Sequence, residues 1–367
     1  MDGLSLFFIF FFGIAALMPV LWAIAAAIRG DAGFWPAIVG GGFAVVLLVI
    51  TFVEIGTNWG GCPRPGEATG SSKNAVVCAT GDTPLDCKPD VWRVECRQPA
   101  GCTTNPPLGE FCPRGQKPVF PFCEHLKTGG VKQPWSTWSD LSFLAAGLWL
   151  LWFLHYFTSP STLRLDSAID NPMISIGWLS VTYGFVAIFM GPPSMWFHAS
   201  MKEWAGWFDS MSVVIWLSFN AAYVFYALAF AMWGRYRGTA RTITVLLSWA
   251  GLVTILGLIA INPDWRLIGY FISGGLWGIF EVSYALHAVS TRAIHRRTWW
   301  LFVINLVLLT ATMLIWVFFN PDVTPLTPPT ACQSRESFPG HALFHILASF
   351  STMLTFASYA SERRVSS

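Results

Sequence analysis

The sequence predicts an all-α membrane protein, and three observations lead to this fold class. Hydrophobic residues make up 54% of the 367 residues, and charged residues only 11%, whereas soluble domains carry about 25% charged residues. The mean hydropathy is +0.53. Nine segments are apolar enough to cross a bilayer, for which about 20 residues are needed. We expect the spans near residues 4–28, 35–56, 138–157, 173–197, 206–233, 242–261, 266–288, 299–319 and 340–360.

The loop charges predict the orientation of these spans, because cytoplasmic loops are enriched in Lys and Arg. In a nine-span chain, ten arginines fall on one face: Arg29, Arg164, Arg235, Arg237, Arg241, Arg292, Arg296, Arg297, Arg363 and Arg364. With the long loop left out, the other face holds three basic residues, Lys202, Arg266 and Arg335. We therefore expect a multi-pass protein whose N-terminus lies outside and whose C-terminus lies in the cytoplasm.

The cysteines lie on the outer face of the same topology. Seven fall in the loop between the second and third spans, namely Cys62, Cys78, Cys87, Cys96, Cys102, Cys112 and Cys123, and Cys332 lies between the last two spans. Disulfides persist outside the cytoplasm, and seven cysteines cannot all pair among themselves. We expect a disulfide-rich outer cap to which Cys332 is joined. A metal site is the alternative, but the chain has no Cys-x-x-Cys pair, and the connectivity of eight cysteines stays open.

These features divide the chain into four parts. We expect two N-terminal transmembrane helices over residues 1–56, a Cys-rich cap over 57–134, a block of seven helices over 135–362 and a cytoplasmic tail over 363–367. The first two helices resemble an addition to the seven-helix block. The small net charge of +2, without a basic cluster interleaved with aromatic residues, gives no support for nucleic-acid binding.

Five polar residues at the ends of apolar spans predict a functional site. Ser194 and His198 are four residues apart at the outer end of the fourth span, and Asp209 lies early in the fifth. His341 and His345, also four apart, begin the ninth span. Residues four apart share a helix face, and the topology places all five at similar depth near the outer face. Polar groups are costly in a bilayer, so their convergence favours a site.

The residue types indicate a catalytic zinc centre. Three imidazoles can hold zinc and leave a fourth position for water, and His198, His341 and His345 are the candidate ligands. Asp209 is the candidate group for moving a proton, and Ser194 for donating a hydrogen bond to an oxyanion. Taken singly, each residue also has an ordinary role, such as helix packing for Ser194 or an N-terminal cap for Asp209.

These residues resemble the pattern of the CREST superfamily of seven-helix membrane hydrolases. Its members include alkaline ceramidases, adiponectin and progestin receptors, and factors that remodel GPI anchors. The shared pattern is Ser-x-x-x-His in the second core helix, Asp in the third and His-x-x-x-His in the seventh. The match covers about residues 135–362, and residues 191–216 and 135–140 are most similar to the alkaline ceramidases.

The resemblance implies a zinc-dependent hydrolase of lipid amides, with a ceramide or related acyl lipid of the bilayer as its substrate. An ester hydrolase of the phospholipase A2 type, as in GPI remodelling, and a receptor with a structural zinc are the alternatives. The ceramidases carry an acidic, calcium-binding cluster before the first core helix, but here Gln133 and Pro134 precede Trp135. This departure weighs against Ca²⁺. The cap and the two extra helices also depart from the ceramidase pattern, and the cap is nearer to the GPI-remodelling branch.

Overall fold

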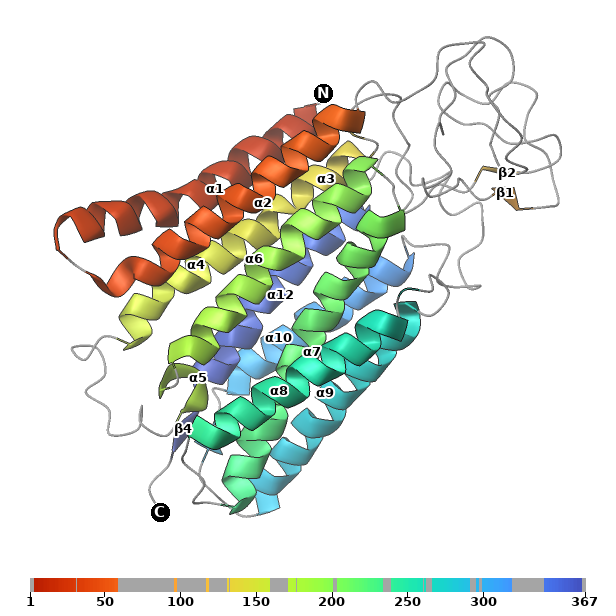
Figure 1. Ribbon diagram of the computed structural model, residues 1–367. Coiled ribbons are helices and arrows are strands. Elements are labelled where there is room, and N and C mark those ends of the chain that lie inside the picture. Colours follow the sequence, from red (N-terminus) through yellow and green to blue (C-terminus); the bar gives the residue numbers. More distant parts are fainter. Residues whose placement is uncertain are drawn as a thin grey trace, which may run out of the picture.

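The protein is an all-α membrane protein in which long helices pack side by side (Figure 1). The computed structural model describes residues 3–30, 32–58, 96–97, 117–118, 131, 133–158, 171–175, 177–200, 203–233, 239–259, 261, 266–290, 295–296, 299–318 and 340–364. The long helices are α1 (Gly3–Ile28), α2 (Trp35–Asn58), α4 (Leu141–Thr158), α6 (Gly177–Ser200), α7 (Glu203–Trp233), α8 (Thr239–Ile259), α9 (Arg266–Ser290), α10 (Trp299–Phe318) and α12 (Gly340–Ala360). Each lies on one of the nine segments predicted as a span.

Shorter elements join these helices. They are the 3₁₀ helix η1 (Ala32–Phe34), the helices α3 (Pro134–Ser139) and α5 (Pro172–Ser175), and the strands β1 (Cys96–Arg97), β2 (Lys117–Pro118), β3 (His295–Arg296) and β4 (Arg363–Arg364). Strand β1 pairs antiparallel with β2, and β3 pairs antiparallel with β4. The expected disulfides, including the one at Cys332, concern side chains outside the described residues and stay a prediction.

Six stretches within the described residues are long and apolar enough to cross a membrane, which supports a multi-pass protein. They are Leu4–Ile28, Trp35–Val53, Pro134–Leu154, Trp204–Ala229, Trp300–Phe318 and Gly340–Ala360. Helices α6, α8 and α9 form at the three other predicted spans, and α8 contains a shorter apolar stretch, Leu247–Ile259. Helix α6 ends in a run of ten buried residues, 191–200, that includes two prolines and a histidine. The polar side chains in this run, such as Ser194 and His198, are therefore surrounded by protein.

The arrangement places α6 and α12 in the interior of the bundle. Helix α6 packs between α4 and α7, while α12 contacts α10, α4 and α3. Helices α1 and α2 cover α4 and α6 on one side, and α8 and α9 lie on the side of α7 (Figure 1). Short α3 lies at the end of the bundle where α1 begins, and strand β4, the last described element, lies at the opposite end (Figure 1).

Glycines allow α4 and α6 to approach closely. A Cβ atom on Gly147 of α4 would lie 2.6 Å from the backbone nitrogen of Ile188 and 2.7 Å from the carbonyl oxygen of Gly184, both on α6. Near the end of α6, a Cβ atom on Gly191 would lie 2.8 Å from the carbonyl oxygen of Asp140. Small residues at helix interfaces permit this backbone contact in membrane proteins. The seam between α4 and α6 thus extends to the junction of α3 and α4.

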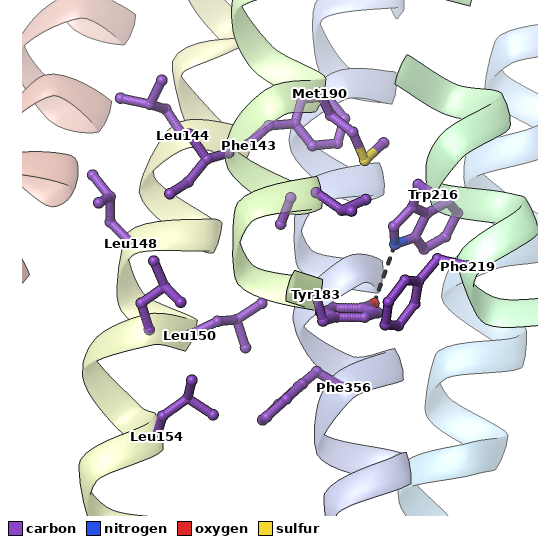
Figure 2. Packing of buried hydrophobic residues seen from close by; sticks show 14 of the residues in the cluster. Phe143, Leu144, Leu148, Leu150, Leu154, Tyr183, Met190, Trp216, Phe219 and Phe356 are labelled. Carbon is purple, nitrogen blue, oxygen red and sulfur yellow. Dashed lines mark hydrogen bonds between the residues drawn. The ribbon is translucent and has the colours of Figure 1, made fainter. Parts of the chain in front are cut away.

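A buried aromatic cluster joins the middle of the bundle (Figure 2). Tyr183 of α6 lies against Phe219 of α7 and Phe356 of α12, with ring centroids 5.4 and 5.6 Å away. Its hydroxyl donates to the carbonyl oxygen of Thr352 at 2.8 Å and accepts a hydrogen bond from Trp216 Nε1 at 3.1 Å. Each polar tip is therefore satisfied within the apolar interior, and α6, α7 and α12 are held in one register.

Candidate metal centre

Three predicted residues converge at the end of the bundle near α3. His198 comes from the last turn of α6, and His341 and His345 come from the first turns of α12. One ligand atom from each lies within 4.8 Å of the others. The ring centroids are 5.0 Å apart for His198 and His341, 5.1 Å for His198 and His345, and 4.5 Å for His341 and His345. The rings are almost fully buried, at 0%, 4% and 2% exposure respectively.

The geometry of α12 brings two of the three rings together. Helix α12 begins at Gly340, so His341 and His345 stand on consecutive turns of the same face. The i, i+4 spacing lets two imidazoles bind one ion. Helix α6 arrives from the opposite direction and supplies the third ring from its final turn.

His345 is surrounded by oxygen atoms on the side of its Nδ1 atom. The Oδ1 atom of Asp140 lies 3.0 Å away, the Oγ atom of Ser139 2.9 Å, and the carbonyl oxygen of Ser136 3.2 Å. Because the Ser139 hydroxyl donates to the Ser136 carbonyl at 2.8 Å, its oxygen is left to accept from the ring. This arrangement favours a proton on Nδ1 and leaves Nε2 as the atom that can bind a metal.

His198 has an equivalent partner on its Nδ1 atom. The Oε1 atom of Gln133 lies 2.7 Å from it. The backbone N–H of Gln133 also donates to the carbonyl oxygen of His198, at 2.9 Å. The start of α3 thus holds the last turn of α6 by two hydrogen bonds, one of them to the ring itself.

The donor set fits a divalent metal ion. Three buried imidazoles are the ligands of open zinc sites, and the second nitrogen of such a ring is ordinarily held by a carboxylate, carbonyl or amide. His198 and His345 meet both conditions. The same set is also compatible with other transition metals, since imidazole binds Zn, Cu, Fe and Ni.

Ser194 lies on α6, the helix that carries His198, and Asp209 lies on the neighbouring helix α7. Ser194 is buried on α6, one turn before His198 and about 6 Å from it along the axis. Asp209 is half-buried in the second turn of α7, which packs against α6. Its carbonyl oxygen accepts a hydrogen bond from Ser212 at 2.7 Å. The catalytic roles of Ser194 and Asp209 stay predictions.

Sequence reasoning missed the partners of the rings. Gln133, Ser139 and Asp140 lie in and beside the stretch that resembles the start of the first core helix, but none was assigned to the site. An acidic residue in the first turn of the predicted span 138–157 was the available signal at Asp140. Its pairing with a histidine 205 positions later depends on how α3 and α12 are packed.

Comparisons with models of known protein families, with curated proteins and with solved structures found no match.

Proposed function

We propose that the chain is a zinc-dependent intramembrane hydrolase of lipid amides, with a ceramidase-like reaction that yields a sphingoid base and a fatty acid. The observation that supports this proposal is the cluster of His198, His341 and His345, buried at one end of a bundle of membrane helices. A metal centre there suits a substrate with long acyl chains, because such a lipid need not leave the bilayer. A role for the bound metal in chemistry agrees with the open three-histidine donor set.

The proposed architecture is that of the CREST superfamily. Helices α4, α6, α7, α8, α9, α10 and α12 form its seven-helix core, with α3 leading into the first of them. Helices α1 and α2 are additions that pack against α4 and α6. The Cys-rich loop is proposed to cover the outer end.

Two further residues carry the proposed reaction, in which water adds to the amide carbonyl carbon and the C–N bond breaks. His198, His341 and His345 would hold a zinc ion, which would supply a Lewis acid for the activation of water and the polarisation of the carbonyl. The carboxylate of Asp209 takes the proton from the attacking water and passes it to the leaving amine. The hydroxyl of Ser194 donates a hydrogen bond to the oxyanion that forms on the carbonyl oxygen.

Asp209→Asn distinguishes catalysis from a metal with a structural role. The amide keeps the size of the side chain but cannot accept the proton. We expect the variant to fold and keep zinc, while hydrolysis falls by roughly 10²–10⁴-fold, as on loss of a general base. Ser194→Ala should keep zinc and lose a smaller factor, about 10²–10³ at most. Lipid mass spectrometry after incubation of purified protein with ceramides and phospholipids measures the products.

Glu281→Gln is the matched control. Glu281 is a half-buried carboxylate on α9, where it accepts a hydrogen bond from Trp277 at 3.3 Å, and it should keep full activity. If the chain releases fatty acid from phospholipids but not from ceramides, the proposed amide hydrolase is wrong and the chain is an ester hydrolase. Zinc binding without turnover of any lipid would favour the alternative of a receptor in which the zinc has a structural role. Full activity of Asp209→Asn would exclude the proton role.

A further inference from the structure

The junction between α3 and α4 places a buried carboxylate beside the metal centre. Asp140 follows directly on α3 and precedes Leu141, the first residue of α4. Its side chain has 0% exposure, and its Oδ1 atom lies 3.0 Å from Nδ1 of His345. Burying a carboxylate is costly unless a positive charge or hydrogen-bond donors compensate it. Three neutral imidazoles and one carboxylate therefore make a pocket in which a divalent cation is favoured.

The contact also favours one tautomer of the His345 ring. A neutral imidazole carries its proton on one nitrogen and a lone pair on the other. Asp140 Oδ1, Ser139 Oγ and the Ser136 carbonyl oxygen, which all lie within 3.2 Å of Nδ1, favour the proton there. The lone pair of His345 then lies on Nε2. A carboxylate behind a metal-binding histidine in this way fixes the ring and strengthens it as a ligand.

The backbone around Asp140 is closely packed. Gly191 of α6 approaches its carbonyl oxygen so closely that a Cβ atom there would lie 2.8 Å away. A cluster of buried apolar residues adds contacts from α1, α2, α6 and α12 around Trp138 and Leu141, on either side of the junction. The backbone that carries the Asp140 carboxylate therefore has little freedom to shift.

We propose that the residues at the two ends of α3 position the histidines of the metal centre. Asp140, which follows α3, is a positioning residue that holds His345 with Nε2 directed at the metal. Gln133 does the same for His198 through its Oε1 atom, 2.7 Å from Nδ1. Gln133 is neutral, so it orients its ring without adding charge. The inference rests on the metal centre of the proposed function and not on the hydrolysis.

Zinc affinity of the purified full chain, measured by competition with a chelator, tests this inference. We expect Asp140→Ala to raise the zinc dissociation constant by about 10–100-fold, the range for loss of such a partner. Asp140→Asn should raise it less, because the amide keeps the size of the side chain and an oxygen that can lie beside Nδ1 but carries no charge. Gln133→Ala should weaken binding by a smaller factor than Asp140→Ala. The visible absorption of bound Co²⁺ should change in Asp140→Ala, because His345 is no longer held in one orientation.

Ser136→Ala is the control on the same helix, because it removes a buried hydroxyl and leaves the carbonyl oxygen near His345. It should bind zinc as the native chain does. Native affinity in both Asp140 variants would overturn the proposal. Native affinity in Asp140→Asn together with failure of Asp140→Ala to fold would assign Asp140 to folding and would also overturn it.

His345→Ala separates this inference from the proposed function. If His345→Ala loses zinc while the Asp140 variants bind normally, the metal centre stands and only the role of Asp140 is wrong. If His345→Ala also binds zinc normally, the metal centre fails and the proposed function fails with it. Weakened zinc binding in Asp140→Ala without any lipid turnover by the native chain would support the positioning role and leave the hydrolase rejected.

Discussion

His341 and His345 occupy consecutive turns of α12, and His198 faces them from α6. We expect the purified chain to carry one zinc ion, and His341→Ala or His345→Ala to lose it, because two imidazoles leave an incomplete ligand set. Elemental analysis of the purified variants measures this. His287→Ala is the control, since His287 is half-buried on α9 and outside the cluster. Metal content that is unchanged in both cluster variants would reject the site.

At the scale of single residues, spacing predicted the three clustered histidines but not the residues that contact their rings. His341-x-x-x-His345 and the membrane topology were enough to bring three rings to one end of the bundle, and the structure confirms that cluster. Gln133 and Asp140 could not be found in this way. Their contacts with His198 and His345 depend on the packing of α3, which no periodicity in the sequence specifies.

Among the elements, the seam between α4 and α6 depends on glycine. Gly147→Ala should lower the free energy of unfolding by about 1–3 kcal/mol, the usual cost of overpacking, because its Cβ atom would lie 2.6 Å from the backbone of Ile188. Thermal unfolding in detergent measures the change. Gly251→Ala on α8 is the matched control, since its Cβ atom meets no heavy atom within 4 Å. Equal stability of the two variants would contradict the close packing.

A hydrogen bond joins α2 to α6, the helix that carries His198. Trp196 Nε1 of α6 donates to Thr51 Oγ1 at 2.7 Å, and Thr51 donates to the Leu47 carbonyl of its own helix. Thr51→Val should lower the free energy of unfolding by about 0.6–1.7 kcal/mol, as for other hydrogen bonds between membrane helices.

Thr310→Val on α10 isolates the interhelical bond. Thr310 is hydrogen-bonded to the Leu306 carbonyl in the same way, and this bond is exposed. Thr310→Val should lower the free energy of unfolding, measured in detergent, by less than Thr51→Val does. An equal change in the two variants would mean that the contact between α2 and α6 contributes nothing measurable.

The loop arginines predict the orientation of the whole molecule in the membrane. We expect the tail at Ser367 to face the cytoplasm, because cytoplasmic loops carry the excess of basic residues. A tag at Ser367 should be labelled only after intact cells are permeabilised, and a tag within residues 57–134 is the control that should be labelled from outside. Labelling of the Ser367 tag in intact cells would reverse the topology and move the metal centre to the inner face.

For the whole molecule, composition predicted the class and the positions of the helices. Apolar length located α1, α2, α10 and α12 almost to the residue, because burial in lipid demands little else of a helix. Composition was less informative for α6, where the buried Pro192, Pro193 and His198 lower the apolar character. The packing of α1 and α2 against α4 and α6 was also not predicted, because lipid-facing and protein-facing apolar residues look alike in a sequence.

The ligands lie far apart along the chain, and this separation has a consequence for synthesis. His198 is made 143 residues before His341, and α12 is the last long helix among the described residues. If the three histidines bind zinc as proposed, a chain whose synthesis stops before residue 340 would carry one imidazole of the three and would not hold the ion. Metal uptake would then follow the synthesis and insertion of α12.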